Sequence, residues 1–101
     1  MAEAIGLFDE QFGSLERAMR IASQRQEVIS QNIANAKTPG YEAQTFDEQL
    51  MKAVKRTEKK DVVLEEELAA LTDNSIKYSA YVKWLSAKTN MLRTIATQGR
   101  R

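Results

Sequence analysis

The feature that most constrains this chain is an unbroken alternation of four- and three-residue steps in its C-terminal third. The steps run from Leu64 to Ala96 without a slip, over more than four heptads, through Leu, Leu, Leu, Ser, Tyr, Val, Leu, Thr, Leu and Ala. This spacing is typical of the seam of a coiled-coil helix. It predicts one long helix of about 38 residues, roughly 57 Å. Asp61 is its expected N-cap and Gly99 its expected stop.

A second set of apolar residues runs beside this seam, outside the a and d positions. A helix in a simple two-stranded coil keeps such positions polar. We therefore expect the C-terminal half of this helix to contact two neighbouring helices at once. The predicted packing residues are Leu64, Leu68, Leu71, Tyr78, Val82, Leu85 and Leu92 in the seam, with Tyr81, Trp84, Met91 and Ile95 beside it.

An amphipathic helix is also predicted from an N-cap at Ser14 to Ala36. At about 100° per residue its apolar side chains fall within half of the helical wheel. They are Leu15, Ala18, Met19, Ile21, Ala22, Val28, Ile29 and Ile33. Residues 1–13 are expected to form a loose apolar lead segment with one or two helical turns. A first helix of about 23 residues leaves some 20 Å of the long helix unmatched, and uncovered apolar surface indicates an interface.

The two helices are joined by a polar connector at residues 37–60. Thr38-Pro39-Gly40 is expected to end the first helix, since proline disfavours helical backbone before it and glycine permits a turn. Five basic residues against one acid between 52 and 60 favour a flexible linker, with a short helix at residues 46–54 as the alternative. The predicted fold is all-α. Residues 1–36 and 61–101 form one coiled-coil domain that other chains complete.

Composition excludes several classes of function. The chain has 101 residues, 15 Lys plus Arg, 14 Asp plus Glu, no histidine and no cysteine. Its length allows one domain, and its net charge of +1 argues against a nucleic-acid partner. The carboxylates are adjacent rather than opposed, so we expect no catalytic, cofactor or metal site and no enzyme. No apolar run is long enough to span a membrane, and the N-terminus lacks a Sec-type pattern.

Charge is distributed unevenly along the chain. Residues 1–50 carry a net charge of −4 and residues 51–101 a net charge of +5. Opposite signs on the two halves favour antiparallel pairing of the helices or head-to-tail packing of copies.

Two segments resemble a known family. The run from Asn32 to Tyr41, preceded by residues 25–31, is similar to the N-terminal signature of bacterial flagellar rod and hook proteins. Residues 68–78, with residues 88–93 and 99–100, resemble the proximal rod subunits of the B type. The positions that match the family motif at the end of the first helix are Asn32, Asn35, Thr38, Pro39, Gly40 and Tyr41. The connector is short for a subunit of this type.

The resemblance implies a non-catalytic structural subunit of the proximal rod of the flagellar basal body, in the periplasm, that assembles helically and transmits torque. It implies as partners copies of the chain, other rod subunits, the rod–ring adaptor, the membrane ring and the export gate, with a peptidoglycan hydrolase as a further candidate. It also implies type III export without a Sec signal. The family's Phe-x-x-x-apolar export motif fits two pairs, Phe8 with Phe12 and Phe46 with Leu50. The alternative is a soluble helical adaptor or export chaperone that binds partner helices.

Overall fold

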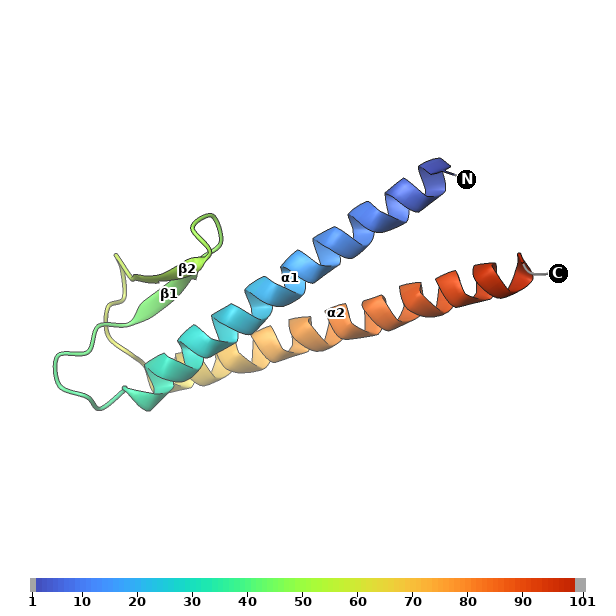
Figure 1. The fold of residues 1–101 in the computed structure, drawn as a ribbon. Helices are drawn as coiled ribbons and strands as arrows, with labels where there is room; N and C mark the ends of the chain where they lie inside the picture. The colour runs from blue at the N-terminus through green and yellow to red at the C-terminus, as the bar shows by residue number, and fades with distance from the viewer. Residues whose placement is uncertain (1, 100–101) are drawn as a thin grey trace.

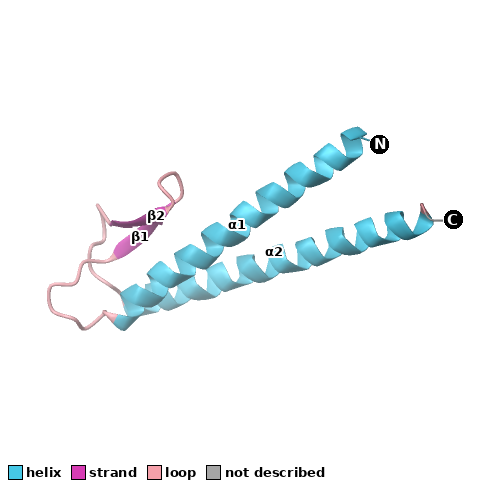
Figure 2. Ribbon diagram, in the orientation of Figure 1, coloured by secondary structure: helices cyan, strands magenta, loops and turns pink. Residues whose placement is uncertain are grey.

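Two long antiparallel helices and a small β-hairpin make up the fold. The computed structural model describes residues 2–99, and the molecule measures 66 × 23 × 15 Å. The elements are α1 (Ala2–Ala34), β1 (Gln44–Asp47), β2 (Lys52–Lys55) and α2 (Leu64–Gln98). The hairpin lies at one end of the helix pair and both termini at the other, where the helices diverge (Figure 1). The helical prediction is confirmed, and the hairpin is an addition to it (Figure 2).

The first helix begins much earlier than the sequence predicted. α1 includes the expected lead segment, so Ser14 is not its N-cap. Gly6 and Gly13 lie within the helix, because an exposed glycine costs about 1 kcal/mol against alanine but does not break a helix as proline does. α1 has 33 residues and α2 has 35. The predicted overhang of the long helix is therefore wrong.

The apolar face predicted for the first helix is buried on two sides. Five of its eight residues are buried: Leu15, Ile21, Ala22, Val28 and Ile29. One side faces α2. On the other side, Ile21 and Val28 form a cluster with Phe46 of β1, and Met51 packs against this cluster. The core is therefore a strip along α1, covered by α2 on one flank and by the hairpin on the other.

The connector contains a folded hairpin where the sequence analysis expected a flexible linker or a short helix. β1 and β2 are antiparallel, and Phe46 lies opposite Ala53 while Thr45 lies opposite Val54. Phe46 is only 7% exposed. The four-residue spacing that suggested a helix at residues 46–54 is therefore coincidental. The hairpin is held because Phe46 completes the core beside α1.

A local hydrogen-bond pattern closes the hairpin. Oδ1 of Asp47 accepts the backbone N–H groups of Gln49 at 2.9 Å and Leu50 at 3.0 Å, a turn that aspartate favours. Met51 follows with a φ of 54°. Strands of four residues that bury few side chains carry too little periodic pattern for a sequence argument to detect.

The long helix starts two residues later than expected and ends where predicted. Its N-cap is Val63, which makes no side-chain capping bond, so the prediction that Asp61 caps the helix is wrong. Three glutamates at positions 65–67 occupy the first turn, where negative charge is favoured by the helix dipole. The N–H of Gly99 donates to the carbonyl of Ile95 at 2.9 Å and ends the helix. In the described part of the chain neither helix combines the length and apolar character needed to cross a bilayer.

Replacing Phe46 by alanine is expected to lower the free energy of unfolding by about 3–5 kcal/mol, because a buried ring is lost from a small core. Urea denaturation followed by circular dichroism measures it. The matched control is Leu50→Ala at the tip of the hairpin, where the side chain is 58% exposed and the expected change is within about 0.5 kcal/mol. Equal losses in the two variants would contradict the packing of the hairpin on α1.

Candidate assembly interface

The side chains of α2 that meet α1 repeat every seven residues and are mostly polar. They include Glu67, Asn74, Tyr81 and Lys88, and outside this repeat the hydroxyl of Ser75 donates to Oε1 of Gln26 at 3.4 Å. Nδ2 of Asn74 donates to the carbonyl of Ala22 at 2.7 Å. Nζ of Lys88 donates to the side-chain oxygen of Gln11. These contacts run in opposite directions along the two helices, which confirms the antiparallel pairing that the charge distribution favoured.

This contact column leaves most of the predicted seam without a partner in the single chain. Relative to that seam, α2 is rotated. The residues that face α1 are those immediately before the seam residues Leu68, Ser75, Val82 and Thr89. Four predicted packing residues are half-buried: Leu71, Tyr81, Leu85 and Leu92. The others are exposed: Leu64 48%, Leu68 46%, Tyr78 37%, Val82 39%, Trp84 55%, Met91 53% and Ile95 52%. The helix pair thus covers the mostly polar contact column, with Glu67 and Asn74 buried, and leaves most of the apolar packing residues exposed.

A fully buried amide joins α1, β1 and α2 at the closed end of the molecule. Asn32, in the last turns of α1, is 0% exposed. Its Nδ2 donates to the carbonyl of Gln44 at 2.8 Å and to Oε2 of Glu67 at 3.4 Å. Its Oδ1 accepts the hydroxyl of Tyr41 at 2.7 Å and the N–H of Gln44 at 3.0 Å. Both donors and both acceptor positions of the amide are therefore used.

An ion pair extends this junction to the segment after the hairpin. Nη2 of Arg56 donates to Oε1 of Glu67 at 2.6 Å, and the Glu67 side chain is only 3% exposed. The N–H of Arg56 donates to the carbonyl of Ala43 at 3.0 Å, and Ala43 donates in turn to the carbonyl of Lys60 at 2.8 Å. A buried carboxylate is tolerated when it is paired and hydrogen-bonded in this way. All polar groups of the junction satisfy one another, which suits a structural joint rather than chemistry on a ligand.

The turn that the sequence predicted after α1 is present. The N–H of Tyr41 donates to the carbonyl of Thr38 at 3.2 Å, and Gly40 has a φ of 78°. With Pro39 before it, Gly40 occupies the position of a type II turn that requires positive φ. Asn35 caps the end of α1, since its Nδ2 donates to the carbonyl of Gln31 at 2.9 Å.

The structure thus brings the motif residues together in two groups. Asn35, Thr38, Pro39 and Gly40 shape the turn, and Thr38 Oγ1 donates to Asn35 Oδ1 at 3.2 Å. Asn32 takes no part in the turn and instead links α1 to β1 and α2.

Burial and the charges of the junction change the pKa of the Tyr41 phenol. Burial raises its pKa above the ordinary value of 10.0, and the negative charge of Glu67 raises the pKa further, against an opposing effect of Arg56. Only the neutral phenol has a proton to donate, so the raised pKa preserves the hydrogen bond from Tyr41 to Asn32.

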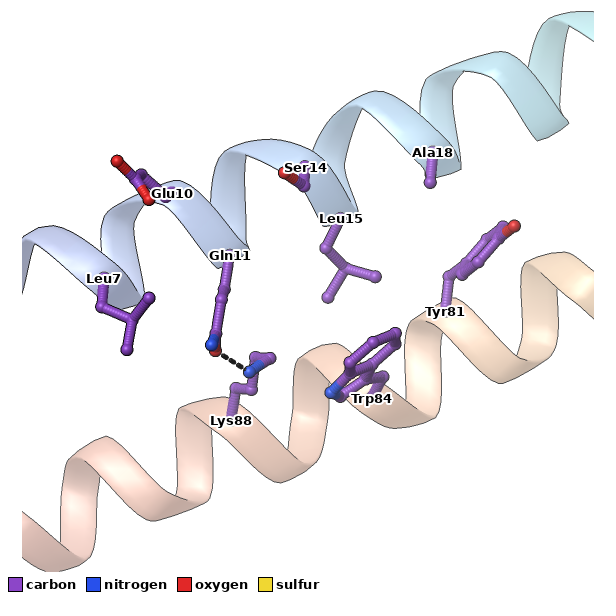
Figure 3. Close-up of a pocket in the computed structure, with 9 residues that line it drawn as sticks. All are labelled: Leu7, Glu10, Gln11, Ser14, Leu15, Ala18, Tyr81, Trp84 and Lys88. Carbon is purple, nitrogen blue, oxygen red and sulfur yellow. Dashed lines mark hydrogen bonds between the residues drawn. The ribbon is translucent and has the colours of Figure 1, made fainter.

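At the diverging end, the helices enclose an open apolar groove of about 290 Å³. Figure 3 shows Leu7 and Leu15 of α1 facing Trp84 and Lys88 of α2 across it. Nζ of Lys88 lies 5.5 Å from the centroid of the Trp84 ring. Leu7 is 56% exposed and Trp84 is 55% exposed, so the single chain fills this groove incompletely.

The two candidate export pairs have different surroundings. Phe46 lies in the core while Leu50 is exposed at the hairpin tip. Phe12 is half-buried on α1, and the side chain of Phe8 lies outside the described residues. The folded chain therefore presents Leu50 but not Phe46.

Sequence reasoning missed residues that make the hydrogen bonds between the two helices and within the junction. The missed residues are Gln11, Ala43, Arg56, Glu67, Asn74 and Lys88. The seven-residue spacing of three of them was available as a signal, but a search for apolar periodicity passes over polar positions. Among residues 2–99, no group of histidine, cysteine or acidic side chains is arranged to hold a metal ion.

Replacing Tyr41 by phenylalanine is expected to cost about 0.5–1.5 kcal/mol of stability near pH 7, since one hydrogen bond to a buried amide is lost. The pH dependence has a definite sign. Because the folded-state pKa of Tyr41 is raised, its contribution is fully present below the ordinary pKa and is lost as pH rises through the folded value.

The difference in stability between the parent and Tyr41→Phe should therefore shrink as the pH increases above 10. Thermal unfolding of both proteins across the alkaline range measures this difference, and effects common to both proteins cancel in the comparison. A difference that grew with pH would contradict the junction geometry.

Comparison with known proteins gives consistent matches. Residues 14–41 match the family described as "Flagella basal body rod protein". The chain is 27% identical to the flagellar basal body rod protein FlgB of Bacillus subtilis over 129 aligned positions, which cover 95% of this chain and all of that protein.

Two shorter alignments have higher sequence identity. The chain is 48% identical over 40 residues to FlgB of Aeromonas hydrophila, covering 40% of this chain and 30% of that protein. It is 53% identical over 32 residues to FlgB of Escherichia coli, covering 32% of this chain and 23% of that protein. The aligned part thus spans less than a third of these two relatives. The chain is thus similar to flagellar basal body rod proteins of the FlgB type, most clearly in the segment that forms the end of α1 and the turn after it, and more distantly over most of its length.

Proposed function

We propose that this chain is a structural subunit of the proximal rod, which assembles helically with other rod proteins and transmits torque. The observation that carries the proposal is the exposed apolar surface of α2, where seven predicted packing residues are at least 37% exposed in the single chain. Monomeric proteins rarely leave so many large apolar side chains of one helix open to solvent. An assembly of packed helices covers it and resists twisting because interiors are close-packed.

The geometry of the junction supports the same function. A rod subunit must hold its two helices at a constant relative position while load passes through it. Asn32 and Glu67 tie the helices together through hydrogen bonds to each other and to the connector. The buried amide of Asn32 uses both its nitrogen and its oxygen in these hydrogen bonds. It therefore specifies one relative position of the helices, because sliding one helix along the other would leave a buried polar group unpaired.

The partners and location are part of this proposal. The chain lies in the periplasmic rod and contacts other rod subunits, the rod–ring adaptor, the membrane ring and the export gate, with a peptidoglycan hydrolase as a further partner. It reaches that place by the flagellar type III pathway. Phe8 with Phe12, or Phe46 with Leu50, supplies the export motif. Since Phe46 is buried after folding, the second pair serves only an unfolded chain. No catalysis is part of the proposal.

Deleting the gene in the source bacterium is expected to leave membrane rings without rod, hook or filament, because a proximal subunit precedes every later one. Electron microscopy of isolated envelopes checks this outcome. Intact and rotating flagella in the deletion strain would contradict the proposed function.

Val82→Asp is expected to abolish motility while leaving the fold intact. Val82 is 39% exposed in the single chain, so the charge is tolerated there, but assembly would bury it without a partner at a cost of several kcal/mol. Swimming assays measure function, and circular dichroism of the purified protein measures the fold. Ala87→Asp is the matched control, since Ala87 is exposed and lies away from the seam. Equal motility in the two variants would contradict a packing role for Val82.

A further inference from the structure

Two sets of exposed apolar residues lie on opposite flanks of the contact between α2 and α1, while Ile76, 64% exposed, lies apart from both. At 3.6 residues per turn, Leu64, Leu68 and Val82 lie on one flank, and Trp84, Met91 and Ile95 lie on the other. We call the first set the ridge patch. We call the second set, together with the groove between Leu7 and Trp84, the groove patch (Figure 3). One patch belongs mainly to the first half of α2 and the other to its second half.

Charge along α2 divides in the same way. Residues 61–76 carry five acidic side chains and no basic one, whereas residues 77–98 carry four basic side chains and no acidic one. The ridge patch therefore lies mainly in the acidic half, near Asp61 and Glu65. The groove patch lies in the basic half, where Lys88 lines the groove together with Glu10 of α1.

We propose that the ridge patch of one copy of this chain docks into the groove patch of a second copy. The contact pairs the acidic half of one α2 with the basic half of the next, in a parallel arrangement displaced along the axis by about 20 residues, or roughly 30 Å. This inference rests on the proposed rod function and specifies which surfaces of the subunit meet.

The placement of the patches excludes a closed dimer through the same surfaces. A twofold dimer that joined ridge to groove in both directions would need both patches on one flank of α2, but they lie on opposite flanks. A dimer of ridge with ridge would bring acidic halves together, and like charges oppose such pairing. A contact between two different patches leaves one of each free, so the assembly propagates as an open helix.

Crosslinking tests this contact. The chain contains no cysteine, so a variant with Leu68→Cys and Met91→Cys carries one thiol in each patch. The full chain is expressed in the deletion strain and treated with a thiol crosslinker whose arm matches the separation of about 8–10 Å between packed helices. The expected result is a ladder of dimers, trimers and larger species on a denaturing gel.

Controls separate the contact from random proximity. Leu68→Cys alone and Met91→Cys alone are expected to stay monomeric, and mixing the two single variants should restore a dimer. Leu68→Cys combined with Thr94→Cys, whose second thiol is exposed away from the groove, should lose the ladder. A dimer from Leu68→Cys alone, or no ladder from the Leu68→Cys and Met91→Cys variant, overturns the proposal.

The rod function itself has a separate readout. If the deletion strain still builds flagella, the proposed function fails regardless of the crosslinks. If the deletion strain lacks rods and the ladder is absent, the subunit function stands and only this contact between copies is refuted.

Discussion

The amide of Asn32 is the interaction on which the rest of the structure depends. It binds the start of β1, the hydroxyl of Tyr41 and the carboxylate of Glu67 at once. Through Glu67 it also reaches Arg56 beyond the hairpin. The end of α1, the segment from Tyr41 to Gln44 and the start of α2 meet at this side chain. Because a buried amide pays a large penalty for each missing partner, this junction fixes where α2 starts relative to the end of α1.

The rotation of α2 follows from that anchor. With Glu67 held at the junction, positions seven residues apart return to the same face, so Asn74, Tyr81 and Lys88 also face α1. Polar contacts across a helix pair specify register at a cost in stability. Oδ1 of Asn74 is buried without a partner among the described residues, which is part of that cost. The apolar seam is displaced outward and stays available for other chains.

Much of the fold could be read from the sequence, and the failures have physical causes. The amphipathic face of α1, the turn at Pro39 and Gly40, and the helix stop at Gly99 were all predicted, because each follows from local backbone preferences or regular spacing. The hairpin was not, since its stability comes from Phe46 meeting residues of α1 far away in sequence. The seam was predicted as a pattern, but which of its members face α1 depends on Asn32 and Glu67, whose polar contact no apolar periodicity reveals.

The divergence of the helices toward the termini has a consequence for local opening. Near the junction, hydrogen bonds hold the helix pair, whereas the far end has an incompletely filled groove and few buried side chains among those that the structure describes. Segments with little burial unfold locally at low free energy while the rest of the protein remains closed. Amide hydrogens in the first turns of α1 and the last turns of α2 should therefore exchange with solvent in a separate, faster group. The two helices are therefore held firmly at the junction and more loosely at their diverging ends. The diverging ends can adjust to a neighbouring chain without disturbing the junction.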